Sequence, residues 1–250
     1  MRFLKVSSVL ILVFCQFLSL AQASGLVVDK MFIIADEKKN GLLTLTNTSD
    51  LPLFISANID EFHVNEDGSD FIKTPYNANN VENWKISTTQ NKLVLHSGES
   101  NNVGIRSLCY NVTCDSSRDL MFFVTFMPSP YRDPGDSSDM SSAMQLNYGF
   151  SPVFIIPTDK PDIKYKINRT DDNLVVENKS NTLIYVSVNS CDNDKMYSGC
   201  FVRYIVIAGR TKVFQLPSEI ENKEITVDVA SYDNSFNKHG KLNINDEFKD

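Results

Sequence analysis

The sequence predicts an all-β protein made of two β-sandwich domains. Apolar and polar residues alternate with period two along much of the 250-residue chain, and runs of β-branched residues recur. Stretches with helical periodicity and capping residues are rare. The predicted strands also fall into two series of seven, and each series is long enough for one sandwich.

Turn-forming residues separate the predicted strands. The first series lies near residues 26–35, 41–47, 53–60, 92–96, 102–108, 120–127 and 143–156. The second lies near residues 163–167, 173–178, 183–188, 201–207, 211–216, 224–230 and 241–244. Pro157 and Pro161 bracket a short polar link between the series, which predicts an N-terminal domain over 24–157 and a C-terminal domain over 158–250.

The N-terminus has the pattern of a cleavable secretory signal. Arg2 and Lys5 precede an apolar run over 9–20, and Ala21-Gln22-Ala23 supplies the small residues at a cleavage site. We therefore expect residues 1–23 to be a signal peptide and the mature chain to be exported. The run is shorter than the ~20 residues that span a bilayer, so a retained anchor is less favoured and no membrane insertion of the mature chain is expected.

The composition argues against a nucleic-acid partner. The formal net charge is -7, and loss of Arg2 and Lys5 with the signal makes it -9. Neither a basic stripe nor aromatic residues interleaved with basic ones occur, although both are typical of proteins that follow a phosphate backbone.

Four cysteines remain after the signal is removed. They form two close pairs, Cys109 with Cys114 and Cys191 with Cys200. In an exported protein such pairs indicate two local disulfides. A zinc site is the alternative, but it is disfavoured because the three histidines, His63, His96 and His239, each stand alone in the sequence.

No motif indicates catalysis. The chain lacks a G-x-S-x-G elbow, an H-E-x-x-H pair and a glycine-rich phosphate loop followed by lysine. The paired carboxylates lie in turn-like contexts, where a solvated role is expected. The sequence therefore predicts that the protein is not an enzyme and has neither a cofactor nor a metal.

Several segments together resemble the periplasmic pilus chaperones of the chaperone/usher pathway, the PapD-like family. In the N-terminal half they are 41–52, 84–88, 92–99, 103–106 and 119–130. In the C-terminal half they are 173–186 and 204–209, together with the hairpin between Cys191 and Cys200. The resemblance implies two immunoglobulin-like domains, work in the periplasm, and two partners: incomplete pilus or fimbrial subunits and an outer-membrane usher.

The resemblance also implies a binding strand. Met144, Leu146, Tyr148 and Phe150 alternate with polar or small residues, so an extended strand has one apolar face. In the family such a strand is lent to a subunit that lacks its own last strand. The same alternation would arise in a strand that only completes its own sandwich, but its position just before the interdomain link favours the lending role.

One feature departs from the family. Members typically place one basic residue on the first strand and one on the seventh, where both bind the subunit's terminal carboxylate. The corresponding positions here are Phe32 and Pro152, which cannot do so. Lys30, Arg106 or Lys160 is a possible substitute, or the chain belongs to a divergent branch, the alternate or archaic chaperones.

Two other readings stay open. A secreted structural or adhesive β-sandwich subunit would also need a signal and disulfides. A secreted eukaryotic glycoprotein would use the four Asn-x-Ser/Thr triplets that begin at Asn47, Asn111, Asn168 and Asn178. Such triplets also arise by chance in a chain rich in asparagine.

Overall fold

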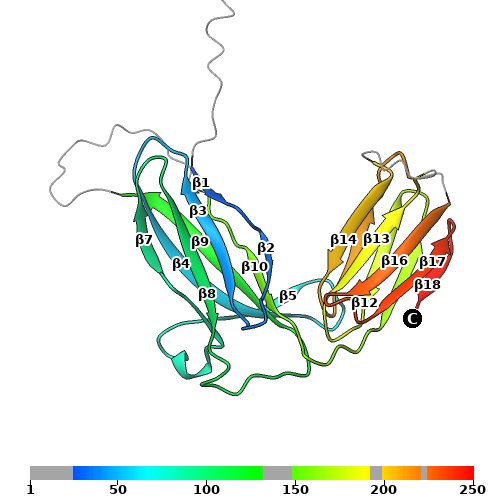
Figure 1. Cartoon of the computed structure of the whole chain (residues 1–250), viewed down its shortest axis with the longest axis horizontal. Helices are drawn as coiled ribbons and strands as arrows, with labels where there is room; N and C mark the ends of the chain where they lie inside the picture. Colours follow the sequence, from blue (N-terminus) through cyan, green and yellow to red (C-terminus); the bar gives the residue numbers. More distant parts are fainter. Residues whose placement is uncertain (1–24, 132–147, 192–198, 221–223) are drawn as a thin grey trace, which may run out of the picture.

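The computed structural model describes residues 25–131, 148–191, 199–220 and 224–250 (Figure 1). The predicted signal peptide, Met144 and Leu146 lie outside these residues. The regular secondary structure of the described residues is almost entirely β, with two sheets in each half, which confirms the prediction of two immunoglobulin-like β-sandwiches.

The N-terminal sandwich consists of two sheets, which we call sheet A and sheet B. Sheet A has the order β1 (Leu26–Val28), β3 (Gly41–Asn47), β8 (Ser100–Ser107) and β6 (Ile86–Thr88). Sheet B has the order β2 (Phe32–Ile34), β10 (Val153–Ile156), β9 (Leu120–Pro130), β4 (Leu53–Val64) and β5 (Phe71–Pro75), and β7 (Lys92–Leu95) also pairs with β4. The pairing of β2 with β10 is parallel, and a short 3-10 helix, η2 (Val81–Asn83), precedes β6.

The C-terminal sandwich also has two antiparallel sheets, sheet C and sheet D. Sheet C has the order β15 (Thr211–Gln215), β12 (Asn173–Asn178), β11 (Tyr165–Arg169) and β18 (Glu247–Lys249). Sheet D has the order β14 (Phe201–Val206), β13 (Ile184–Asn189), β16 (Ile225–Ser231) and β17 (Asn237–Leu242).

Each sandwich has its own apolar core, made by the inward residues of its two sheets. Leu43, Leu45 and Phe122 are fully buried in the first core, and Val176 and Val186 are fully buried in the second. Along β3, β12 and β13 the buried side chains alternate with more exposed neighbours, as period-two patterning requires. The alternation therefore assigns one face of each of these strands to its core.

The structure corrects the first predicted strand, over 26–35. The chain forms two short strands instead: β1 pairs with β3 in sheet A, and β2 pairs with β10 in sheet B. The segment crosses from one sheet to the other between them, where Asp29 accepts a hydrogen bond from the Thr44 N–H. The apolar pattern of this segment in the sequence does not indicate that its pairing changes from sheet A to sheet B.

The structure also corrects the expected end of the strand near 127. Strand β9 continues through Pro128 and Pro130, which pair with Ile55 and Leu53 of β4. The N–H groups of Val124 and Phe126 point the other way, toward the carbonyls of Pro152 and Phe150. By period two, the proline nitrogens face that same side, so the missing N–H groups leave the pairing with β4 intact.

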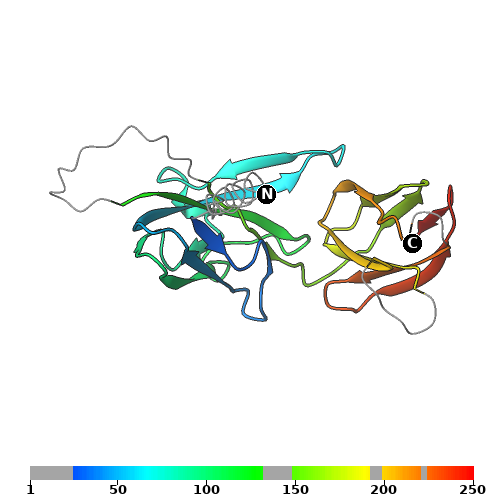
Figure 2. The same cartoon turned by 90° about the horizontal axis from the view of Figure 1, so that it is seen from above.

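The two sandwiches are joined by an apolar cluster, which we call the interdomain cluster. Its buried members are Phe62, Met121 and Ile155 from the first half and Leu183 from the second. The sandwiches lie side by side and meet at one end (Figure 1), and the β4–β5 hairpin extends toward the second sandwich (Figure 2). The polypeptide link is thus not the only connection between them.

Asp119 forms the polar part of this junction. Its carboxylate accepts hydrogen bonds from the N–H groups of Thr158 and Leu183, at 2.9 and 2.8 Å. Its own N–H donates to the carbonyl of Asn181 at 2.9 Å. Burial raises the pKa of this carboxyl above its ordinary value, although the N–H donors favour the charged form. One side chain therefore ties β9 to the link and to the start of β13.

Candidate functional site

The chain that leads into β10 changes its environment over three residues. Phe150 forms an isolated antiparallel bridge with Phe126 and packs against the core of the N-terminal sandwich. Tyr148, two residues earlier, is 72% exposed. The two were predicted to share one apolar face, but Phe150 belongs to the sandwich itself, whereas Tyr148 lies beyond that core. The structure does not describe Met144 and Leu146, the other two predicted members of this face.

The opposite side of the same segment lies on the outer face of sheet B. The hydroxyl groups of Ser151 and Thr125 form a hydrogen bond of 2.8 Å. A Cβ added to Gly149 would overlap the sulfur of Met127 and lie 3.0 Å from the carbonyl oxygen of Phe126. A side chain at position 149 would therefore displace the Met127 side chain and crowd the backbone of β9.

Pro128 limits how far this segment can pair with β9. Phe126 and Phe150 exchange both backbone hydrogen bonds, at 2.7 and 3.0 Å. The next such pair along an antiparallel ladder would be Pro128 with Tyr148, and proline has no N–H to donate. The carbonyl of Tyr148 therefore cannot accept from β9, and regular pairing on this side ends at Phe150.

The outer face of sheet B carries three packed phenylalanine rings near the junction of the sandwiches. Phe62 and Phe123 stack with ring centres 4.1 Å apart, and Phe71 meets their edges at 5.1 and 5.5 Å. All three belong to the interdomain cluster. The outer surface of a sheet is here apolar instead of solvated.

Three cations lie over aromatic rings of the interdomain cluster. The Lys73 ammonium is 4.6 Å from the ring centre of Phe123, and the Arg203 guanidinium is 4.0 Å from that of Tyr185. Arg210 lies 4.6 Å from the ring centre of Phe71. No local motif marks these three cations in the sequence, because strand register and contacts between the sandwiches put them over the rings.

The three cations predicted as carboxylate ligands are not brought together by the structure. Lys30 donates to the carbonyl of Leu42 at 3.3 Å, over the outer side of sheet A. Arg106 is exposed on β8, and its neighbour Ile105 points into the core, so Arg106 faces away from sheet B. Lys160 is exposed on the interdomain link.

The two positions where the family carries basic residues are apolar in this structure as well. Phe32 packs against the interdomain cluster, and Pro152 is buried. Phe32 also pairs in register with Val153, so β2 and β10 lie side by side at this edge of sheet B. The edge beside the junction is therefore lined by apolar side chains.

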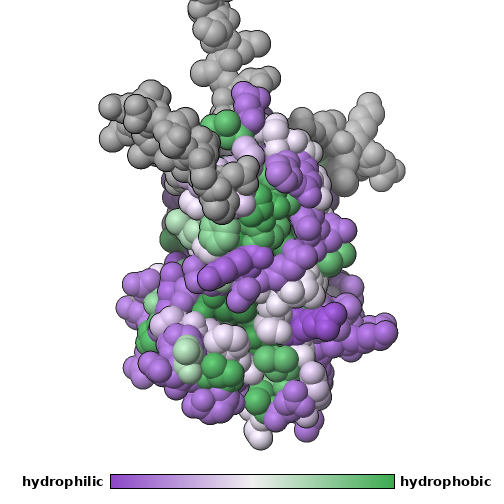
Figure 3. Space-filling model, turned by 90° about the vertical axis from the view of Figure 1, so that its left-hand side faces the viewer, coloured by the Kyte–Doolittle hydropathy of each residue, from purple (hydrophilic) through white to green (hydrophobic). Residues whose placement is uncertain are grey.

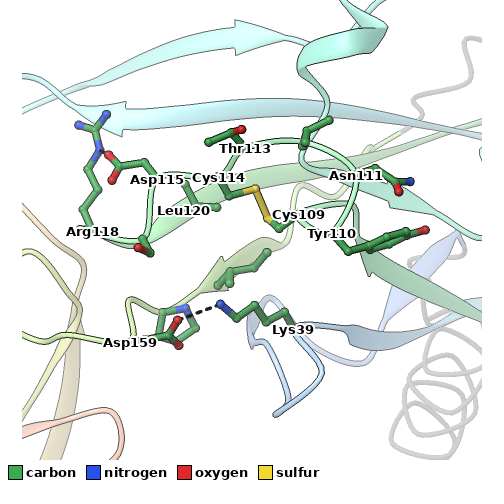
Figure 4. Close-up of a pocket in the computed structure, with 14 residues that line it drawn as sticks. Lys39, Cys109, Tyr110, Asn111, Thr113, Cys114, Asp115, Arg118, Leu120 and Asp159 are labelled. Atoms are coloured by element: carbon green, nitrogen blue, oxygen red, sulfur yellow. Dashed lines mark hydrogen bonds and ion pairs between the residues drawn. A yellow bond between two sulfur atoms is a disulfide. The ribbon is translucent and has the colours of Figure 1, made fainter.

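Both predicted disulfides are present, Cys109–Cys114 and Cys191–Cys200. The first closes a loop beside a cavity of about 430 Å³ between the β2–β3 turn and the interdomain link (Figure 4). Lys39 and Asp159 form an ion pair at 3.1 Å across it. The charged groups that line this cavity are thus paired with each other, as Arg118 and Asp115 also are, at 3.2 Å.

Two of the four glycosylation triplets begin at buried asparagines. Asn47 is 0% exposed and Asn178 is 1% exposed. Each side-chain amide donates to carbonyls of the turn that follows its strand and of a neighbouring strand or turn. Neither asparagine can carry a glycan in the folded protein, so half of the support for the glycoprotein reading is lost.

Within the described ranges, no group of three or more His, Cys, Asp or Glu side chains is placed to hold a metal ion. None of the helical structure in those ranges is long and apolar enough to cross a membrane.

The face of the N-terminal sandwich turned away from the second sandwich shows apolar patches between hydrophilic ones (Figure 3).

Comparison with known proteins agrees with this architecture. The family described as "CS5 fimbrial protein N-terminal domain" matches residues 28–157, just over half of the chain. A solved structure titled "Crystal Structure of Class 5 Fimbriae Chaperone CfaA" superimposes with a TM-score of 0.52 and 11% identity, covering 88% of this chain and 99% of that one. A second, from work titled "Chaperone-tip adhesin complex is vital for synergistic activation of CFA/I fimbriae biogenesis", gives 0.50 and 12%, covering 88% and 97%. No curated protein sequence matches significantly.

Proposed function

Because the chain belongs to the CS5 fimbrial protein N-terminal domain family, we propose that it is a periplasmic chaperone for pilus or fimbrial subunits. It binds subunits that lack a strand, keeps them from aggregating by lending them the strand that leads into β10, and delivers them to an outer-membrane usher. We place the signal peptide at 1–23 and the domains at 24–157 and 158–250. The predicted resemblance to PapD-like chaperones is confirmed, and the fold they share with this chain supports the proposal.

The environment of Tyr148 is the observation that carries this proposal. Its side chain is 72% exposed although it continues an apolar alternation. Its backbone carbonyl has no hydrogen-bond donor on β9, because the residue opposite is Pro128, which has no N–H. A partner that lacks a strand has unpaired backbone groups and an apolar groove, and both are satisfied by such a segment. Each side chain buried in the groove contributes about 1.5 to 3 kcal/mol before ordering costs.

The proposed contact residues now fall into two groups. Met144, Leu146 and Tyr148 are offered to the subunit, whereas Phe150 also completes the chaperone's own core. Substitution should separate the groups. Tyr148→Asp should abolish capture of a co-expressed subunit while the chaperone stays folded, and Phe150→Asp should unfold the N-terminal sandwich.

Tyr110→Asp is the matched control. Tyr110 is 81% exposed but lies in the Cys109–Cys114 loop, away from the strand that leads into β10. The single tryptophan, Trp84, belongs to the N-terminal sandwich, so its fluorescence reports the folding of that half. Pull-down of a subunit at wild-type level by Tyr148→Asp would exclude the lending role.

We also propose that a cation binds the subunit's terminal carboxylate. Lys30, Arg106 and Lys160 remain candidates from the sequence, and the positions of Lys73 and Arg203 beside the interdomain cluster support them as further ones. Each should be replaced by alanine and subunit affinity measured. Equal affinity in all five variants would exclude this form of anchoring.

A fimbrial subunit is the second candidate function, because the matching family is itself described as a fimbrial protein domain. A chaperone should form a soluble one-to-one complex with a subunit in size-exclusion chromatography and stay out of the fibre. Incorporation of the chain into assembled fibres would favour the subunit instead.

A further inference from the structure

The β4–β5 hairpin ends in a tightly bonded turn. Asn65 closes it, because its N–H donates to the carbonyl of Asp70 at 3.0 Å and its side-chain oxygen accepts from the N–H groups of Ser69 and Asp70, both at 3.0 Å. Asp67 adds a hydrogen bond from the Ser69 N–H at 2.8 Å. A turn with this many internal bonds holds one shape. The tip of the hairpin is therefore held in a fixed position relative to sheet B.

The tip contacts the C-terminal sandwich through Gly68. The N–H of Thr211, at the start of β15, donates to the Gly68 carbonyl at 3.0 Å. Gly68 has a φ of +75°, and a Cβ there would lie 2.7 Å from the Thr211 hydroxyl and 2.9 Å from its nitrogen. Both the backbone conformation and the close approach require glycine at this position.

Side chains of the hairpin reinforce the contact on both sides of the turn. The Arg210 guanidinium lies over the ring of Phe71, 4.6 Å from the ring centre. Val64, which pairs with Phe71 across the hairpin, lies against Gly209, where an added Cβ would be 3.5 Å from that of Val64. Residues 209–211 of the second sandwich are thus held between the two strand ends and the turn.

We infer that this hairpin tip is an interdomain brace, a contact that fixes the angle between the two sandwiches. The link and Asp119 join the sandwiches at the start of β9 and the end of β10, and the brace joins them at β5. In sheet B, β5 lies at the opposite edge from β2 and β10. The interdomain cluster includes Val64 and Phe71, so the attachment extends across sheet B from the link to the hairpin. Such an extended attachment restricts the hinge motion expected of domains joined by a short link alone.

The brace goes beyond the proposed function, because it sets the geometry of the junction whether or not a subunit is bound. In the described parts of the chain, no strand of the second sandwich pairs with the β2–β10 edge. The two halves should consequently behave as one body.

The experiment measures the distance between the sandwiches in the mature full-length protein. Nitroxide labels at Lys92→Cys on β7 and Lys241→Cys on β17 report it by double electron–electron resonance, and the four native cysteines of the described chain are held in disulfides. We expect one narrow distribution. Gly68→Val should broaden it about twofold, because relative domain motion follows when an interdomain contact is lost.

Gly98→Val is the matched control. Gly98 has a φ of +74°, so valine there imposes the same backbone strain, but nothing lies within 4 Å of its added Cβ. The control should keep the narrow distribution. If Gly68→Val fails to fold, Val64→Ser combined with Arg210→Ser removes the side-chain contacts without strain and should broaden the distribution in the same way.

An unchanged distribution in a folded Gly68→Val protein, or in the double variant, would overturn the brace. Equal broadening by Gly68→Val and Gly98→Val would also overturn it, because the effect would then come from strain alone. Capture of a subunit is not part of this measurement, so failure of the brace and failure of the proposed function are distinguishable.

Discussion

The outer faces of sheet B and sheet C show how two similar sandwiches have become different. On sheet B, Phe62 and Phe123 form an apolar surface that packs into the interdomain cluster. On sheet C, Glu247 forms ion pairs with Lys166 and Lys249 at 2.7 and 2.9 Å, in contact with solvent. The inner faces of both sandwiches are mainly apolar. The outer face therefore decides which sandwich docks its sheet against a neighbour and which is solvated.

The two sandwiches nevertheless share one local device. Asn47 ends β3 and Asn178 ends β12, and both side chains are buried. Each accepts from the N–H of a serine two residues later and donates to the carbonyl four residues later. A repeated polar device in two cores indicates that the turn it closes is essential to the sandwich.

The largest expected effect tests the contrast between the outer faces. Phe62→Ala should lower the free energy of unfolding by about 3 to 5 kcal/mol, because a buried ring is lost from the interdomain cluster. Val213→Ala, at a 56% exposed position on the outer face of sheet C, is the control and should change it by less than about 0.5 kcal/mol. Urea unfolding followed by far-UV circular dichroism measures both. Equal losses of stability in the two variants would contradict the contrast between the outer faces of sheet B and sheet C.

The shared asparagine device gives the next largest effect. Asn47→Ala and Asn178→Ala should each cost about 2 to 3 kcal/mol, because buried carbonyls lose their donor. Trp84 fluorescence should detect mainly the Asn47 change, since the only tryptophan lies in the N-terminal sandwich. Asn111→Ala, at an exposed asparagine, is the control. A small loss from one variant and a large loss from the other would show that the device is not equivalent in the two halves.

Asp119→Asn tests the polar junction between the sandwiches. An amide has one acceptor oxygen, so either the Thr158 or the Leu183 N–H loses its partner, at a cost of about 1 to 2 kcal/mol. Differential scanning calorimetry should show the two halves unfolding in more separate transitions than in the wild type. Asp171→Asn, in the exposed turn before β12, should leave the thermogram unchanged. Wild-type behaviour of Asp119→Asn would mean that the apolar cluster alone joins the halves.

The smallest expected effect concerns the charged face of sheet C. Hydrogen bonds and ion pairs with Lys166, then with Lys249, lower the pKa of Glu247 to about 2. A lowered pKa contributes stability above the ordinary value of 4.5, and this contribution is lost as the pH falls toward 2. Glu247→Gln should therefore be slightly less stable than the wild type at pH 7 and equal to it near pH 2. A constant difference across this range would contradict the assignment.

Strands with one buried face were the most predictable from the sequence. The predicted ranges 41–47 and 173–178 coincide with β3 and β12, because their alternation reflects one core and one outer face. Strand β5 was not predicted, since most of its residues are exposed and it has no such alternation. It is nevertheless the strand that carries the brace, through contacts with a distant segment.

The candidate site was predictable only in part. Tyr148 and Phe150 have the same parity, so period two places them on one face, and no pattern indicates that the sandwich's own core ends between them. The cations Lys73 and Arg203 were missed for a related reason. Arg203 reaches Tyr185 across the β13–β14 pair, and Lys73 of β5 reaches Phe123 of β9 across sheet B, so both contacts depend on strand pairing and register.

The sequence by itself determined the all-β class, the two series of strands, the two cysteine pairs and the apolar alternation before the link. These follow from local rules, since period two and turn residues act over a few neighbours. Only the tertiary structure decided that the outer face of sheet B is buried at the junction, that Pro128 ends the pairing at Phe150 and that Gly68 meets Thr211. Those features depend on strand register and on contacts between segments far apart in the chain, which local patterns do not encode.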